Sequence, residues 1–220
     1  MNKCQLTLNI KLSTNMKKAF FWALMLTVSM TACKGGKTEN TETTEEQPKA
    51  VGLAIDETNF PDPFMLEYML DGITGMDSIL TDEENKNFWK VDVSYQGATD
   101  LTGVEKLTGV TYINANGFEG TSIDLSNNPT IYEVYCCDSP KLTSLKLASN
   151  PNIGILNINN TNISSIDLTQ CSKLQTLRIK GTPISALDLS GCPELEVIEC
   201  NEELKPNLDL SACPKAGFED

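Results

Sequence analysis

The sequence predicts an α/β solenoid of about 21-residue coils that stack into a parallel β-sheet. Segments of 21 residues begin at Lys146, Asp167 and Asp188, and each carries apolar residues at matching offsets. Pro, Asn and Gly between these apolar positions leave no room for a long helix inside a coil. A chain of 220 residues suits about one domain, with a small additional element.

One copy shows the geometry of a coil. Residues 167–187 read DLTQCSKLQTLRIKGTPISAL, and their apolar positions are Leu168, Leu174, Leu177, Ile179, Ile184 and Leu187. The short strand is predicted at Leu177-Arg178-Ile179. Since one coil cannot bury its apolar side alone, neighbouring coils stack with their strands about 4.8 Å apart. The flanking copies are Asp124–Leu145 with one inserted residue, Asp100–Ile123 with three, and the truncated Asp209–Asp220.

The spacing L-x-x-L-x-L-x-x-N/T-x-L over residues 100–220 resembles that of leucine-rich repeats. It is similar to bacterial surface proteins of this class, especially lipoproteins of Bacteroidetes. Upstream, NFPDPFMLEYML at 59–70 resembles the helical N-terminal cap of internalin-like arrays. The resemblance implies a small helical N-terminal cap over 57–99, followed by the repeats. It also implies a role in binding, adhesion or scaffolding, without catalysis.

Several proteins of that class carry a calcium-loop-like stretch in the cap. The corresponding residues 71–84 of this chain lack the alternating acids at positions 1, 3 and 5 that an EF-hand requires. Thr81 followed by Asp82, Glu83 and Glu84 instead predicts an N-capped helix start. We therefore expect no metal and no cofactor.

The first 33 residues predict an export signal. Met16-Lys17-Lys18 precedes an apolar run over 19–28, which is too short to span a bilayer of roughly 30 Å. Residues 29–33, SMTAC, resemble the lipobox of bacterial lipoproteins, which implies that Cys33 is lipidated. Simple secretory cleavage after Ala32 is the alternative.

The predicted organisation is a signal peptide with lipobox over 1–33, whose true start is Met16, and a flexible acidic tether over 34–56. The predicted location is the outer membrane, lipid-anchored, at the cell surface.

The eight cysteines divide by position. Cys171, Cys192 and Cys213 recur at 21-residue intervals, in the interior column that Asn128 and Asn150 occupy in earlier copies. Cys136 and Cys200 fall on the core side of their strands, and Cys137 is predicted to point outward. Structural thiols are the favoured interpretation. Disulfides remain an alternative, and so does a metal site of four convergent cysteines.

Charge and composition exclude several classes of function. The chain has no His, and losing the four lysines before Cys33 lowers its formal charge from −13 to −17. Such an acidic surface argues against nucleic-acid binding. Without His, no Ser/His/Asp or Cys/His catalytic arrangement is possible, and the acidic pairs are sequence neighbours with no apolar pocket. We expect no enzyme.

Residues between the core positions of each strand are predicted to face solvent on the concave side of the array. These are Gly109, Thr111, Ile113, Glu133, Tyr135, Cys137, Ile155, Asn157, Asn159, Thr176, Arg178, Lys180, Val197, Glu199 and Asn201. The predicted central column is Thr111, Tyr135, Asn157, Arg178 and Glu199, and its last four members are the candidate ligand-binding residues.

Three alternatives stay open at this stage. Arg178 and Lys180 beside Glu199 also fit an ordinary cross-strand charge pair. The other two alternatives are a ligand on another face and a chain with no specific partner.

The predicted function is a membrane-anchored, extracytoplasmic recognition module for a host or bacterial protein, a peptide or a glycan. We expect a monomer that touches the membrane only through its lipid. The alternative is a periplasm-facing envelope scaffold that holds partner lipoproteins.

Overall fold

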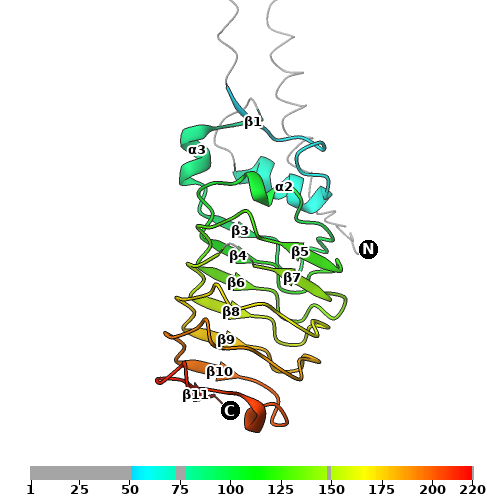
Figure 1. Ribbon diagram of the computed structural model, residues 1–220. Helices are drawn as coiled ribbons and strands as arrows, with labels where there is room; N and C mark the ends of the chain where they lie inside the picture. The colour runs from blue at the N-terminus through cyan, green and yellow to red at the C-terminus, as the bar shows by residue number, and fades with distance from the viewer. Residues whose placement is uncertain (1–50, 73–77, 148–149, 220) are drawn as a thin grey trace, which may run out of the picture. The chain divides into compact units, whose positions relative to one another are not determined.

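The computed structural model describes residues 51–72, 78–147 and 150–219 (Figure 1). The predicted signal peptide and Cys33 lie outside these residues, as does the predicted tether up to residue 50. In the part that the structure describes, no helix has the length and apolar content to cross a membrane.

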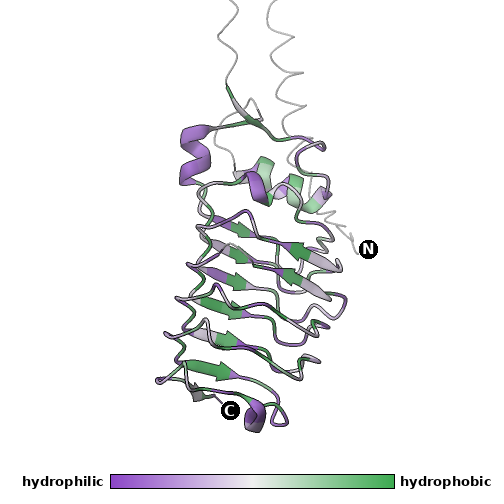
Figure 2. Ribbon diagram, in the orientation of Figure 1, coloured by the Kyte–Doolittle hydropathy of each residue, from purple (hydrophilic) through white to green (hydrophobic). Residues whose placement is uncertain are grey.

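Seven short parallel strands form the main sheet in the order β11-β10-β9-β8-β6-β4-β3 (Figure 1). The strands are β3 (Lys90–Asp92), β4 (Tyr112–Asn114), β6 (Glu133–Tyr135), β8 (Ile155–Asn157), β9 (Thr176–Arg178), β10 (Val197–Glu199) and β11 (Gly217–Phe218). The middle residue of each strand from β3 to β10 is buried. Figure 2 shows that these strands carry hydrophobic residues, drawn in green. The predicted solenoid of about 21-residue coils is therefore confirmed.

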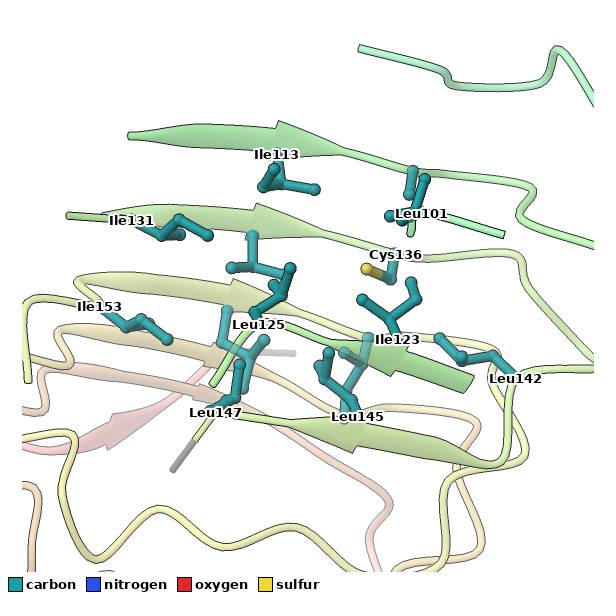
Figure 3. Close-up of a cluster of buried hydrophobic side chains, with 14 of the residues drawn as sticks. Leu101, Ile113, Ile123, Leu125, Ile131, Cys136, Leu142, Leu145, Leu147 and Ile153 are labelled. Atoms are coloured by element: carbon teal, nitrogen blue, oxygen red, sulfur yellow. The ribbon is translucent and has the colours of Figure 1, made fainter. Parts of the chain in front are cut away.

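A second, two-stranded parallel sheet pairs β5 (Ser122–Asp124) with β7 (Ser144–Lys146). Figure 3 shows side chains from its strands, Ile123 and Leu145, in the same buried cluster as Ile113 of the main sheet. Elsewhere the coils turn through irregular segments and two single turns of 3-10 helix, Val104–Lys106 and Lys205–Asn207. The apolar repeat thus produces one continuous core between the two sides of the coil.

Two helices and a small antiparallel sheet precede the first coil (Figure 1). Strand β1 (Gly52–Ala54) pairs with β2 (Ile79–Thr81), and α2 (Pro63–Gly72) and α3 (Asp82–Asn87) follow the two strands. The prediction of a tether up to residue 56 is therefore wrong for residues 52–54. The short GLA segment has too little pattern to predict a strand, and it forms one only because β2 supplies its partner.

A buried carboxylate at the start of α2 bonds the helix to the chain that leads into the coils. Asp62 Oδ1 accepts hydrogen bonds from the backbone N–H groups of Phe64 and Met65, at 2.9 and 3.0 Å. Its Oδ2 accepts from the N–H and hydroxyl of Thr99 and from the N–H of Asp100. Burial alone raises the pKa of Asp62, but these hydrogen bonds outweigh it and hold the pKa below the ordinary value.

Helix α3 begins as predicted, in a capping box. The Thr81 hydroxyl accepts from the N–H of Glu84, and the Glu84 carboxylate accepts from the N–H of Thr81. Near the end of the helix, the buried side chain of Asn85 donates to Lys106 O and accepts from Thr108 N, both at 2.9 Å. Asp62 and Asn85 therefore join the helical region to the coils, together with Tyr68, whose hydroxyl donates to Lys90 O, and Asn59, whose Oδ1 accepts from Lys106 Nζ.

The interior column of Asn and Cys is confirmed. Asn128 Nδ2 donates to Val104 O at 2.8 Å, and Asn150 Nδ2 donates to Leu125 O at 2.8 Å. The thiol of Cys192 lies 3.6 Å from Leu168 O, and that of Cys213 lies 3.4 Å from Leu189 O. Each side chain thus bonds to the backbone of the preceding coil.

The six cysteines in the described residues are free thiols. Burial raises the pKa of Cys136 and Cys192 to about 12, so both stay protonated and unreactive at neutral pH. Cys136 and Cys200 are buried in the core as predicted. Cys137 is half-buried, and its thiol donates to Asn116 Oδ1 at 3.0 Å.

Candidate binding surface

Two columns of outward side chains run along the main sheet, and we call them together the strand face. The first column is Lys90, Tyr112, Glu133, Ile155, Thr176 and Val197. The second column is Asp92, Asn114, Tyr135, Asn157, Arg178 and Glu199. The four candidate residues Tyr135, Asn157, Arg178 and Glu199 therefore do lie in one continuous column.

The prediction for the first coil is wrong. Ile113, predicted to face solvent, is fully buried, and Asn114 rather than Thr111 pairs with Tyr135. Gly109, predicted on the same face, instead packs against the backbone of Lys86 at the end of α3. The three-residue insertion in that copy moved the assumed strand by an odd number of residues, and such a shift exchanges the two faces of a strand.

In the register of the structure, Trp89, Tyr112 and Tyr135 form an aromatic cluster. The ring centroids of Trp89 and Tyr112 lie 6.3 Å apart at an interplanar angle of 65°, and those of Tyr112 and Tyr135 lie 5.6 Å apart at 42°. These geometries are favourable for aromatic pairs. Trp89 is 58% exposed although it is large and apolar. The cluster extends over β3, β4 and β6.

Two asparagines flank Tyr135 in its column and are held in the same way. Asn114 Oδ1 accepts from the N–H of Asn116 at 3.2 Å, and Asn157 Oδ1 accepts from the N–H of Asn159 at 3.1 Å. Because each oxygen is bonded to its own chain, each amide has a defined orientation. Neither Nδ2 has a hydrogen-bond partner within the described residues, so both are available as donors.

The hydroxyl of Tyr135 donates to Glu133 Oε2 at 2.9 Å. Burial, together with the nearby Glu133 carboxylate, raises the pKa of Tyr135 to about 12, so the hydroxyl stays protonated. In the first column, the Lys90 ammonium lies 5.3 Å from the Tyr112 ring centroid and 3.0 Å from Asp92 Oδ2. We call the strand face from β3 to β8 the aromatic half.

The strand face from β9 to β11 has a different character, and we call it the paired half. Arg178 Nη2 lies 2.8 Å from Glu219 Oε2, and Arg178 Nε lies 3.4 Å from Glu199 Oε2. The hydrogen bond to Glu219 is the main cause of the raised pKa of Arg178. Lys180 also approaches Glu199, at 3.9 Å. The Arg178 guanidinium, predicted to hold a ligand carboxylate, is thus engaged by two carboxylates of its own chain.

Two further tyrosines border the aromatic half, each reaching across two coils. Tyr95 lies over Gly117, where an added Cβ would meet its ring, and its hydroxyl donates to Asp138 at 2.9 Å. Tyr132 lies over Gly154 in the same way and reaches the Gln175 side chain at 3.2 Å. Tyr95 has a φ of 53°, a strained value for a bulky residue. These contacts stiffen both edges of the aromatic half.

Among the residues that the structure describes, no group of three His, Cys, Asp or Glu side chains is arranged to hold a metal ion. The strand face instead combines aromatic rings, oriented amides and internally paired charges. Such a surface can bind a ligand without changing it chemically.

No protein-family model and no curated protein matches the chain. Among solved structures it is similar to internalin C2 of Listeria monocytogenes, with 17% identity, 78% of this chain and 93% of that chain covered, and a TM-score of 0.50. It is also similar to a leucine-rich-repeat protein of Leptospira interrogans, with 16% identity, 62% and 38% covered, and a TM-score of 0.51. These similarities bear out the predicted leucine-rich-repeat fold.

Proposed function

We propose that this chain is a recognition module whose strand face binds a protein, a peptide or a glycan. The observation that carries the proposal is the aromatic cluster of Trp89, Tyr112 and Tyr135 on one face of the sheet. Tyr and Trp are enriched among the residues that dominate binding energies, because they offer large rigid surfaces with a polar tip. The oriented amides of Asn114 and Asn157 add hydrogen-bond donors beside these rings.

The opposite sheet offers much less to a ligand. The outward residues of β5 and β7 include the small side chains Ser122 and Ser144. They also include the exposed pair of Lys146 and Asp124, whose Nζ and Oδ2 atoms lie 3.2 Å apart. Exposed pairs of this kind contribute little binding energy. The aromatic half of the strand face is therefore the better candidate for the binding site.

A mixed array of peptides and glycans tests this proposal. The purified full chain is compared with Trp89→Ala/Tyr135→Ala, and Lys141→Ala, at a side chain 60% exposed away from the strand face, is the matched control. We expect at least one class of probe to be retained by the wild type and by the control, and to be lost by the double variant. Equal retention by all three proteins would move the site to another face.

We further propose that a lipid on Cys33 holds the module at the outer membrane. The support is the apolar run that ends in Thr31-Ala32-Cys33. Cys33→Ser should move the protein from the membrane fraction to the soluble fraction, whereas Cys4→Ser, upstream of the expected start, should not. A Cys33→Ser protein that still sediments with membranes would contradict lipidation at this residue.

Exposure at the cell surface is the last part of the proposal. Protease added to intact cells should degrade the repeats if they face outward. Protection in intact cells, followed by cleavage after the outer membrane is opened, would instead support the periplasm-facing scaffold.

A further inference from the structure

We propose, building on the binding role of the strand face, that the aromatic half recognises a neutral oligosaccharide. A sugar ring stacks on Trp89, beside the half-buried rings of Tyr112 and Tyr135, and hydroxyl groups of the ligand bond to the side chains around Tyr135. Three independent features of this half support the assignment: the exposed Trp89 ring with its aromatic neighbours, the oriented amides and the pairing of its charges.

The three rings lie next to one another but are inclined, with interplanar angles of 65° between Trp89 and Tyr112 and 42° between Tyr112 and Tyr135. The Lys90 ammonium lies 5.3 Å from the Tyr112 ring centroid, so the stacking surface is the Trp89 ring, which Tyr112 supports at its edge. One face of a pyranose ring is made of C–H groups, and it packs well against a flat aromatic ring that already excludes water. Trp89 is the most exposed of the three rings and is the natural outer stacking residue.

The polar groups around the platform suit hydroxyls, which both donate and accept. Asn114 and Asn157 each bond through Oδ1 to their own backbone and leave Nδ2 unpartnered within the described residues. Glu133 accepts from Tyr135 through Oε2, and among these residues no donor reaches its Oε1. Because the side chains are already fixed, binding costs little further conformational entropy.

The charges argue for a neutral ligand. The cations of the strand face are all paired: Lys90 with Asp92, and Arg178 and Lys180 with Glu199. An anionic ligand would therefore have to displace an internal carboxylate. A basic peptide would meet one carboxylate without an ion pair, that of Glu133, whose Oε2 is bonded to Tyr135.

Titrations with pure probes test the assignment. Trp22→Phe in the full chain leaves Trp89 as the sole tryptophan and reporter. The probes are hexasaccharides of glucose, mannose, galactose, xylose and N-acetylglucosamine, and a panel of acidic, basic and uncharged peptides is titrated in parallel. We expect a saturable change in Trp89 fluorescence with at least one hexasaccharide.

Variants locate the interaction. Tyr112→Ala should weaken the affinity for that hexasaccharide at least tenfold. Asn157→Asp, which keeps the side-chain shape but removes the free N–H donors, should weaken the affinity about fivefold or more. Lys141→Ala should leave the affinity within twofold of the wild type, and circular dichroism should show the same fold in every variant.

Two outcomes would overturn the assignment. Saturable binding of peptides alone, lost in Tyr112→Ala, would replace the oligosaccharide by a peptide and leave the recognition function standing. Absence of saturable binding to every hexasaccharide and every peptide would overturn the oligosaccharide and would count against the recognition function as well.

Discussion

The strand face has an aromatic half from β3 to β8 and a paired half from β9 to β11, and the same coil supports both. In the aromatic half, Tyr135 lies between two asparagines whose Nδ2 groups have no partner within the described residues. In the paired half, Arg178 in the same column is bound by Glu199 and Glu219. One column thus leaves its donors available over some coils and satisfies them internally over others.

This difference shows why a column of interface-prone residue types is not by itself a binding site. Arg and Tyr are both common at hot spots. A guanidinium that already has two carboxylate partners must lose them before it can bind a ligand, whereas an aromatic face and a free amide need only lose water.

The aromatic half should depend on the helical region that adjoins it. Asp62→Ala removes the acceptor of the buried N–H of Met65 and of the partly buried N–H groups of Phe64, Thr99 and Asp100. Since a buried donor without a partner costs about 1–3 kcal/mol and the partly buried donors add smaller amounts, we expect a loss of about 4 kcal/mol in the free energy of unfolding, measured in urea. The exposed Asp167→Ala is the control, with an expected loss below about 1 kcal/mol. A loss below about 1 kcal/mol for Asp62→Ala would show that the helices are not tied to the coils through this carboxylate.

The interior column at Cys192 should tolerate a neutral polar side chain but not a charged one. Cys192→Asp buries an unpaired carboxylate and should lower the free energy of unfolding by about 3 kcal/mol. Cys192→Asn should stay within about 1 kcal/mol of the wild type, because Asn128 and Asn150 occupy the same column in earlier coils. Equal losses for the two variants, measured by urea unfolding, would contradict the assignment of this column to the interior.

Acid should weaken the attachment of the helical region. The pKa of Asp62 is lower in the folded chain than its ordinary value of 3.8, so its stabilisation is complete above that pH. It is lost as the pH falls through the lower, folded value. The free energy of unfolding of the wild type should therefore fall in this acidic range, and Asp62→Asn should show a smaller fall. Parallel pH profiles for both proteins would contradict the lowered pKa.

The ion pairs of the paired half should contribute least to stability. Arg178→Ala breaks contacts with Glu199 and Glu219 that are partly exposed to solvent. We expect a loss below about 1 kcal/mol, reduced further in high salt. A larger loss that persists in high salt would show that this pairing is a structural element rather than a surface contact.

Much of this architecture could be predicted from the sequence, because the repeat carries it. The 21-residue period placed strands β6, β8, β9 and β10 and the interior cysteines, and Thr81 followed by three acids marked the start of α3. Tyr112 was missed because the insertion in its copy obscured the register, and Trp89 was missed because it precedes the copy that begins at Asp100. The alternation of Tyr112 and Asn114 around the apolar Ile113 was the available signal.

Contacts between distant parts of the chain could not be predicted in this way. Arg178 reaches Glu219 across 41 residues, and Asp62 reaches Thr99 across 37. The period of a sequence repeat predicts which residues share a column. It does not predict which side chains in that column already have a hydrogen-bond or ion-pair partner. That pairing separates the aromatic half from the paired half, and it depends on the three-dimensional structure.

A double variant in each half should change the ligand affinity very differently. Trp89→Ala/Tyr135→Ala and Arg178→Ala/Glu199→Ala are titrated with the probe that the array retains. Loss of a hot-spot ring costs about 2 kcal/mol or more, so the first variant should weaken binding by about thirtyfold or more. The second should change it by less than about threefold. The opposite order, with the larger loss in the paired half, would contradict the claim that the aromatic half binds the ligand.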